Sequence, residues 1–294
     1  MFSKIMVPLD GSSLAEQALP MAVRFAERMN AKLVLYRVVP YFTVLAADPL
    51  LYEEMNRLGE DEALAYLRQV REDVTSPLPT ETICEVGSAA ESVLQYANEN
   101  DVDLIIISSH GRSGLNRWVY GSVAERIMSQ APCPTLILNA RRSDSPNAPQ
   151  NILVTLDGSE LAEKALEPAM DMASALESQL HLLRVTTSGH MRIEIDSSPD
   201  LIDGIESNEL VEAQEYLKEL SQRIGLEDGQ LSVEVAKGTV AEAIIEYAAN
   251  NDIDLITISS HGRTGLKRWV YGSVAEKVLR GACCATMIVR NSEI

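Results

Sequence analysis

The chain repeats itself, and this duplication constrains its fold more than any other feature. The segment 108–126, SSHGRSGLNRWVYGSVAER, recurs at 259–277 as SSHGRTGLKRWVYGSVAEK, an offset of 151 residues. Asp10 and Asp157 hold matching places in VPLDGSSLAEQAL and VTLDGSELAEKAL, at an offset of 147. This period is far too long for a solenoid repeat, so it indicates duplication of a whole domain.

The duplication divides the 294 residues into two domains of ordinary size, 1–140 and 151–294. The segment between them, 141–150, is polar and contains two prolines, a composition typical of a linker. Hydrophobic residues make up 46% of the chain, which is enough for a separate core in each half.

Charge restricts the partners of this chain, because 43 acidic residues against 25 basic ones give a net charge of −18. An acidic surface repels nucleic acids and anionic membranes, so we expect neither as a partner, and an anionic ligand must be held by local groups. No stretch approaches the roughly 20 apolar residues of a membrane span, and the N-terminus has no signal-peptide pattern. The four cysteines lack metal-ligand spacing. We expect a cytoplasmic protein.

Strand-like and helix-like patterns alternate along each half. In the first half, apolar or β-rich runs predict strands at 4–10, 31–39, 80–86, 103–108 and 135–138. Helical spacing predicts helices at 12–30, 51–72, 88–100 (opening with the capping box Ser88-x-x-Glu91) and from about Ser122. The second half repeats this pattern. It predicts an α/β fold of two tandem doubly wound domains, each with a five-stranded parallel sheet of order 3-2-1-4-5 and helices on both faces.

In such a sheet, ligands bind beyond the carboxyl ends of the strands, where the strand order reverses. That point lies between strands 1 and 4. Asp10 is predicted to end strand 1, and the segment 108–111 follows strand 4, with the same arrangement in the second half. The two most closely repeated segments therefore converge on the predicted crevice.

The glycine-rich repeat has the composition of a phosphate site. Gly111 and Gly121 let the backbone approach a ligand closely, and the helix that opens at Ser122 offers unpaired N–H groups and a positive dipole end. A structural interpretation is also open, because Ser122-x-x-Glu125 is a capping box. Asp10 and Asp157 are open to two interpretations as well, a helix cap or Asx turn, or a carboxylate that accepts hydrogen bonds from a ribose or base.

Other phosphate and catalytic motifs do not fit this chain. It has no GxxxxGK[ST] loop, no GxGxxG after the first strand and no GxSxG nucleophile elbow. His110 and His261 follow serines directly, a placement that rarely gives triad geometry. His181 and His190 have no counterparts in the first half. We therefore name no catalytic residue.

At these residues the chain resembles the universal stress protein family over nearly its whole length. ATP-binding members carry G-x-x-G, nine residues and then G-S or G-T. Gly111 with Gly121-Ser122 matches this spacing, and Gly262 with Gly272-Ser273 matches it again. The family's strand-1 aspartate falls on Asp10 and Asp157, and its adenine-contacting valine falls on Val38 and Val185. The first glycine of the motif is replaced by Ser108 and Ser259, whose Cβ would lie beside the ribose.

The resemblance implies that each domain binds ATP, or AMP or ADP, with a Mg or Mn ion on the phosphates. It implies that the glycine loop and Ser122 or Ser273 contact the phosphates. It also implies pairing of the two domains about a pseudo-twofold axis, with a homodimer as a further option. We expect a regulatory stress-response protein with little or no turnover. The alternatives are a slow ATPase, or an interaction module that has lost nucleotide binding.

Overall fold

The computed structural model describes residues 2–41, 49–74, 77–108, 121–139, 148–187, 199–226, 229–260 and 272–290. The chain divides into two compact units, Met1–Ala148 and Pro149–Ile294, and each is described by itself. None of the described helices has the length and apolar character that a bilayer-spanning segment needs.

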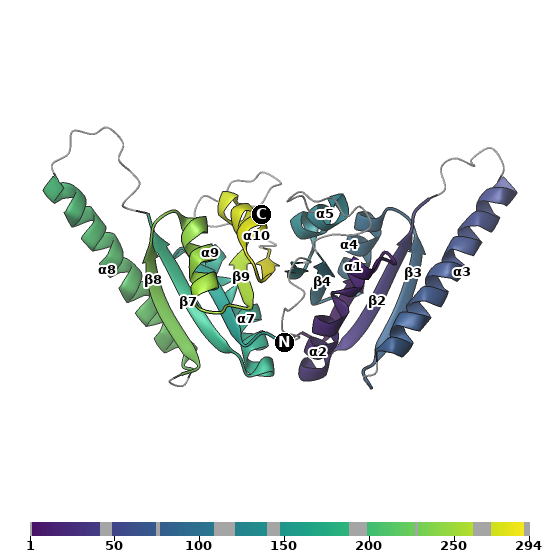
Figure 1. Cartoon of the computed structure of the whole chain (residues 1–294), viewed down its shortest axis with the longest axis horizontal. Helices are drawn as coiled ribbons and strands as arrows, with labels where there is room; N and C mark the ends of the chain where they lie inside the picture. The colour runs from purple at the N-terminus through teal and green to yellow at the C-terminus, as the bar shows by residue number, and fades with distance from the viewer. Residues whose placement is uncertain are drawn as a thin grey trace. The chain divides into compact units, whose positions relative to one another are not determined.

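The N-terminal unit contains one parallel sheet of order β3-β2-β1-β4-β5, which confirms the predicted order (Figure 1). Its strands are β1 (Lys4–Pro8), β2 (Lys32–Val39), β3 (Thr80–Val86), β4 (Leu104–Ser108) and β5 (Thr135–Leu138). Its helices are α1 (Ser13–Glu16), α2 (Leu19–Met29), α3 (Pro49–Asp73), α4 (Ala89–Glu99) and α5 (Ser122–Gln130).

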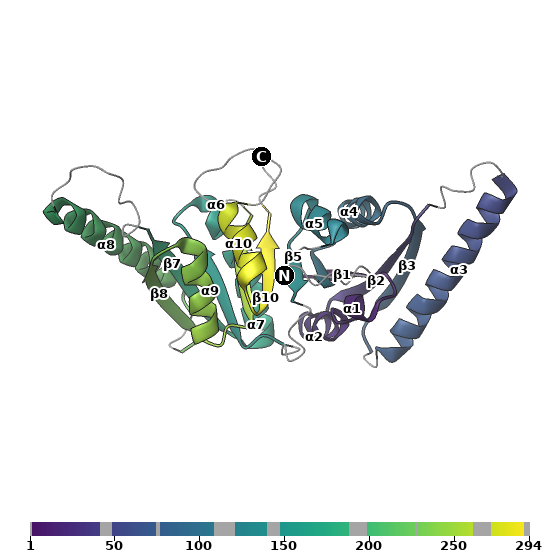
Figure 2. The same cartoon turned by 45° about the horizontal axis from the view of Figure 1, so that its top comes forward.

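The C-terminal unit repeats this sheet with the order β8-β7-β6-β9-β10, again all parallel, and Figure 2 brings α6 and β10 into view. Its strands are β6 (Asn151–Leu156), β7 (Gln179–Thr186), β8 (Leu231–Lys237), β9 (Leu255–Ser259) and β10 (Ala285–Val289). Its helices are α6 (Glu160–Glu163), α7 (Leu166–Leu176), α8 (Pro199–Ile224), α9 (Val240–Asn250) and α10 (Ser273–Gly281).

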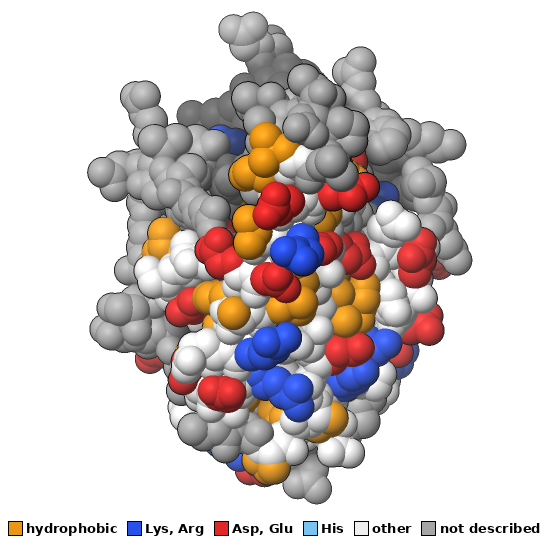
Figure 3. All heavy atoms as spheres, turned by 90° about the vertical axis from the view of Figure 1, so that its right-hand side faces the viewer, with side chains coloured by type: hydrophobic (Ala, Val, Ile, Leu, Met, Phe, Trp, Pro, Cys, Tyr) orange, Lys and Arg blue, Asp and Glu red, His pale blue; other side chains and the backbone are white. Residues whose placement is uncertain are grey.

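Helices cover both faces of each sheet, as right-handed crossovers in two directions require. Neighbouring side chains of β2 show the two faces directly. Tyr36 points toward α4, where its ring centroid lies 5.0 Å from that of Tyr96, whereas the Arg37 guanidinium lies over the ring of Tyr66 on α3. On the outer face of α3, acidic and basic side chains are interspersed (Figure 3). The central strands β4 and β9 are almost fully buried, which explains their largely apolar sequences, LIIIS and LITIS.

The prediction of one continuous helix over 12–30 was wrong. The segment forms the short helix α1 and then α2, and the C-terminal unit forms α6 and α7 in the same way. Each second helix has a proline in its first turn, Pro20 or Pro168. Proline has no N–H to donate, and its ring clashes with the carbonyl four residues earlier, so the helix cannot run through it.

One carboxylate joins the amino ends of the two central strands in the N-terminal unit. Asp103 Oδ2 accepts hydrogen bonds from the N–H of Ser3 at 2.8 Å, the hydroxyl of Ser3 at 2.6 Å and the N–H of Lys4 at 2.9 Å. Partial burial acts to raise the Asp103 pKa, but these hydrogen bonds outweigh it and hold the pKa below its ordinary value. Asp254 makes the matching contacts to the N–H groups of Gln150 and Asn151.

We predict that Asp103→Ala lowers the free energy of unfolding by about 1–3 kcal/mol at pH 7, because it leaves the donors of Ser3 and Lys4 without their partner. The folded-state pKa of Asp103 is depressed, so its carboxylate stabilises the protein fully above the ordinary aspartate pKa of about 3.9. This contribution is lost as the pH falls from there through the folded-state pKa. Urea titrations at several pH values test this. Asp61→Ala, at an exposed position on α3, is the control. A difference between the variants that persists at low pH would contradict the assignment.

Candidate functional site

A tight turn follows the first strand of the N-terminal unit. The strand β1 ends at Pro8, so Asp10 lies two residues beyond it rather than at its end. Asp10 Oδ1 accepts hydrogen bonds from the N–H of Ser12 at 2.9 Å and the hydroxyl of Ser12 at 2.6 Å. The Ser12 hydroxyl oxygen in turn accepts from the N–H of Ala15 at 3.2 Å and caps α1. Gly11 has a φ of 83°, which favours glycine.

The C-terminal unit builds the same turn with the same geometry. Asp157 Oδ1 accepts from the N–H of Ser159 at 2.9 Å and from its hydroxyl at 2.6 Å, and Ser159 caps α6 through the N–H of Ala162 at 3.2 Å. Gly158 has a φ of 85°. The interpretation of Asp10 and Asp157 as Asx-turn residues is therefore confirmed. The serine beside each aspartate holds the carboxylate in a fixed orientation.

The helices after the glycine-rich repeats do not begin with the capping box that the sequence suggested. The N-cap of α5 is Gly121 and that of α10 is Gly272, and among the described residues no side chain caps either helix start. Ser122 and Ser273 are the first helical residues and are exposed. The capping-box interpretation of Ser122 was therefore wrong, because an N-cap lies outside the helix and a first-turn serine cannot take that role.

Protein geometry does not require glycine at these two N-caps. The φ values of −58° and −54° suit any residue. Within the described residues, a Cβ on Gly121 would meet no atom within 4 Å, and one on Gly272 would lie 3.6 Å from the Ser260 carbonyl oxygen, an ordinary contact. Each glycine lies at the positive end of the helix dipole, where the first-turn N–H groups have no intrahelical partner.

Backbone hydrogen bonds place the start of α10 at the carboxyl edge of the sheet. The N–H of Gly272 donates to the Ser260 carbonyl at 3.0 Å, and the N–H of Ser260 donates to the Val289 carbonyl at 2.9 Å. Ser260 directly follows β9, and Val289 ends β10. The helix N-terminus therefore lies beside the ends of these two strands, at the edge where Asp157 follows β6.

The remaining predicted residues lie at the same edge or outside the described residues. Ser108 and Ser259 end β4 and β9, and Val38 and Val185 are next to last in β2 and β7. The Ser108 hydroxyl oxygen is buried and has no hydrogen-bond partner among the described residues. Gly111 and Gly262 lie outside the described residues, as do His110, His190 and His261.

His181 lies at the amino-end side of β7, away from this edge. Its ring nitrogens are 3.2 Å from the Tyr247 hydroxyl and 3.3 Å from Asn151 Oδ1. Burial lowers the pKa of His181, so the ring is held neutral within a hydrogen-bonded core. These contacts are those of an ordinary structural histidine.

Sequence reasoning missed a cation at the site. A Cβ built on Gly11 would lie 3.2 Å from Arg37 Nη2, so the guanidinium packs against the turn that carries Asp10. Arg184 is its counterpart at the offset of 147 that also relates Asp10 to Asp157. That shared offset is the sequence signal that could have identified both arginines.

We predict that two serines at helix starts differ in their contribution to stability. Ser12→Ala removes both a cap and a donor to Asp10, and should lower the free energy of unfolding by about 1–2 kcal/mol. Ser122→Ala removes no side-chain cap of α5 and should change it by less than about 0.5 kcal/mol. Urea midpoints measure both, with Ser159→Ala and Ser273→Ala as the matched pair. Equal losses from Ser12→Ala and Ser122→Ala would restore the capping-box interpretation.

Comparison with known proteins gives a consistent result. The model of the universal stress protein family matches residues 1–139 and 149–290. The chain is 23% identical over 317 aligned positions to the universal stress protein E homolog of Haemophilus influenzae, covering 99% of this chain and 98% of that relative. It is 28% identical over 155 residues to universal stress protein MJ0531 of Methanocaldococcus jannaschii, covering 52% of this chain and 89% of the relative.

The crystal structure of a universal stress protein from Archaeoglobus fulgidus has the same fold. It aligns with a TM-score of 0.69 and 20% identity, covering 99% of this chain and 97% of that chain. The family model matches once in each half, and each half carries the same five-stranded sheet. This chain belongs to the universal stress protein family.

Proposed function

We propose that each half of the chain binds an adenine nucleotide, ATP foremost, at the carboxyl ends of its central strands. The protein then acts as a regulatory stress-response protein with little or no turnover. The observation that carries this proposal is the glycine-led, uncapped helix N-terminus, which occurs in α5 and again in α10. Backbone N–H groups at such an end bind phosphate without a basic side chain.

Local binding of this kind suits a protein with a net charge of −18. The overall field repels an anion, so the helix N–H groups must supply the attraction at short range. In α5 the N–H groups of Ser122, Val123 and Ala124 precede the first intrahelical bond, from the Glu125 N–H to the Gly121 carbonyl. The exposed hydroxyl of Ser122 adds one more donor for a phosphate oxygen.

The other predicted residues suit the nucleoside. Ser12 holds the Asp10 carboxylate in one orientation, which a ribose contact requires, and Ser159 does the same for Asp157. The half-buried Val38 and Val185 offer apolar surface to a base. The buried Ser108 hydroxyl gains from a ligand partner, because an unsatisfied buried hydroxyl costs about 1–3 kcal/mol.

We further propose that a Mg or Mn ion accompanies the phosphates. Among the described residues, no group of three or more His, Cys, Asp or Glu side chains could hold a metal ion. Phosphate oxygens and water would therefore supply most of its ligands, as is usual for magnesium. EDTA should weaken nucleotide binding without lowering the stability of the nucleotide-free protein.

We predict that millimolar ATP with magnesium raises the melting temperature by a few degrees, since ligand at one hundred times Kd stabilises the native state by about 2.7 kcal/mol. Gly121→Asp together with Gly272→Asp should abolish this shift and leave the fold intact, because each places a negative charge where a phosphate binds. The control is Ser88→Asp with Thr239→Asp, at the N-caps of α4 and α9. A flat calorimetric titration of the natural chain would rule out the proposal. Phosphate release over hours would instead indicate a slow ATPase.

A second prediction concerns the serines that replace the first motif glycine. Ser108→Gly with Ser259→Gly removes a Cβ beside the ribose but also removes a hydroxyl. These effects are each on the order of 1 kcal/mol, so the Kd for ATP should change by less than about tenfold. Calorimetric titration measures the change. A far larger gain in affinity would show that the natural serines block the site, and an interaction module would replace nucleotide binding as the function.

A further inference from the structure

Three side chains from three elements meet beside the Asp10 turn, and we call them the Arg–Tyr–Glu cluster. Arg37 comes from β2, Tyr66 from α3 and Glu16 from α1. The Arg37 guanidinium carbon lies 4.6 Å from the centroid of the Tyr66 ring. The Tyr66 hydroxyl donates a hydrogen bond to Glu16 Oε1 at 2.8 Å. The cluster therefore ties the long outer helix to the short helix that the turn begins.

The guanidinium also packs against the turn itself. A Cβ on Gly11 would lie 3.2 Å from Arg37 Nη2 and 3.3 Å from its Cζ, closer than such contacts normally are. Arg37 therefore lies between the ring of Tyr66 and the backbone between Asp10 and Ser12. A planar cation held by stacking on one side and backbone on the other limits where the turn can move.

The C-terminal unit contains the same cluster, formed by Glu163, Arg184 and Tyr216. The Arg184 guanidinium carbon lies 5.1 Å from the ring centroid of Tyr216, and the Tyr216 hydroxyl donates to Glu163 Oε1 at 3.0 Å. A neighbour of the cluster differs between the two units. The residue paired with the arginine on the adjacent strand is Cys84 in the N-terminal unit and Val235 in the C-terminal unit. The three residue types and their contacts recur while a neighbour changes.

The tyrosine hydroxyls remain donors at physiological pH. Burial, and then the hydrogen bond and charge of Glu16, raise the pKa of Tyr66 above its ordinary value. Burial and the charge and hydrogen bond of Glu163 raise the pKa of Tyr216 in the same way. Each glutamate is therefore held from the outer helix by a protonated phenol.

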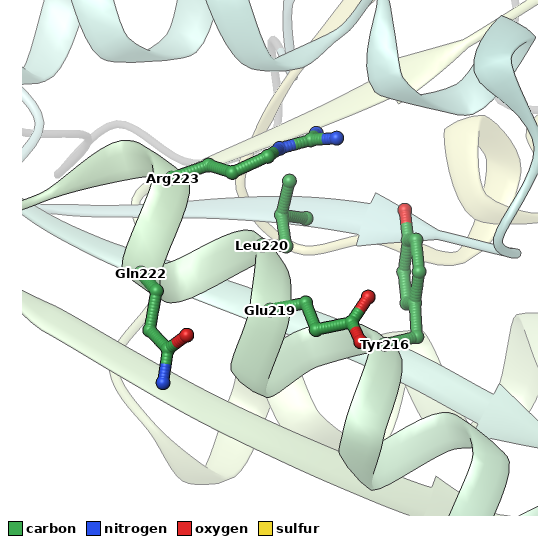
Figure 4. Close-up of a pocket in the computed structure, with 5 residues that line it drawn as sticks. All are labelled: Tyr216, Glu219, Leu220, Gln222 and Arg223. Carbon is green, nitrogen blue, oxygen red and sulfur yellow. The ribbon is translucent and has the colours of Figure 1, made fainter.

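The two clusters differ in their additional ion pairs. Arg184 is buried and bonds Glu212 at 3.1 Å, and Arg223 bonds Glu163 Oε2 at 2.5 Å. Tyr216 and Arg223 both project from α8 and line a hollow of about 370 Å³ (Figure 4). Arg37 is half-buried and makes no ion pair within the described residues. The N-terminal cluster therefore depends on Arg37 with fewer additional restraints, which makes it the better unit to test.

We propose that Arg37 and Arg184 are positioning residues that hold the turn of Asp10 or Asp157 in the orientation a nucleotide ribose requires. The inference rests on the proposed nucleotide site, and it gives the arginines a role that acts through the aspartate. It accounts for an arginine that occupies the same cluster in both units, at the same offset as the aspartate. Simple packing between β2 and α3 would not require a cation there, because an apolar side chain would pack as well.

The test uses the full chain with Gly272→Asp, so that only the N-terminal site binds. Calorimetry compares ATP with 2′,3′-dideoxy-ATP, which lacks the ribose hydroxyls. The Gly272→Asp chain is the parent for this comparison. We expect it to bind ATP about tenfold or more tightly than the dideoxy nucleotide, as a hydrogen bond to a charged group allows. Arg37→Met should reduce this preference to about threefold or less and leave the affinity for the dideoxy nucleotide nearly unchanged. Lys32→Met is the matched control, because Lys32 pairs with Glu81 at the far end of the same strand.

Hydrogen–deuterium exchange without nucleotide gives a second, independent readout. Arg37→Met should speed exchange at the N–H groups of Ser12 and Ala15 at least threefold relative to Lys32→Met. Equal losses of affinity for both nucleotides, or an unchanged preference, would overturn the positioning role. If the parent binds no ATP, the proposed function fails, and unchanged exchange in Arg37→Met would then overturn the positioning role as well.

Discussion

The strand β1 is paired on both of its edges, and the other features of the N-terminal unit depend on this pairing. The strand β6 has the same role in the C-terminal unit. A strand bonded to β2 on one side and β4 on the other sends its crossovers in opposite directions. The connections after β1 and β4 then leave the sheet on opposite faces, and folds of this kind bind ligands where the two connections diverge. The Asp10 turn and the glycine-led start of α5 follow these two strands, so topology alone brings them to one edge.

Electrostatics at this edge differs from that of the whole molecule. The chain is strongly acidic, yet each unit presents a positive helix end, and in the N-terminal unit Arg37 packs against the turn of Asp10. Fixed dipoles act over a few ångströms, whereas the net charge acts over a Debye length of about 8 Å in physiological salt. A ligand therefore has to enter the crevice before it gains from these groups. This suits the proposed ligand, a nucleotide, because its nucleoside part is neutral.

Much of this arrangement could be predicted from the sequence, because it follows from local patterns. The five strands and their order come from apolar periodicity and from strand–helix alternation. Three features could not be predicted in this way. The break before α2 depends on Pro20, which the apolar spacing of that segment conceals. The start of α5 at Gly121 depends on backbone geometry, since Ser122-x-x-Glu125 satisfies the capping pattern equally well. The Arg–Tyr–Glu cluster joins residues far apart in sequence that carry no motif, and only the tertiary fold brings Arg37 to Tyr66.

Among the described residues no atom opposes a side chain at Gly121, and this has a consequence for how the protein can change over evolutionary time. Its backbone conformation is available to every amino acid, and no described neighbour within 4 Å opposes a side chain there. Folding therefore exerts almost no selection on this position, whereas Gly11 is restricted by both its φ and the adjacent guanidinium. If selection for ligand binding relaxed in one half, Gly121 or Gly272 would be free to drift while the aspartate turn stayed intact. A duplicated chain could in this way retain one working site and turn the other into a folded scaffold available for a new partner.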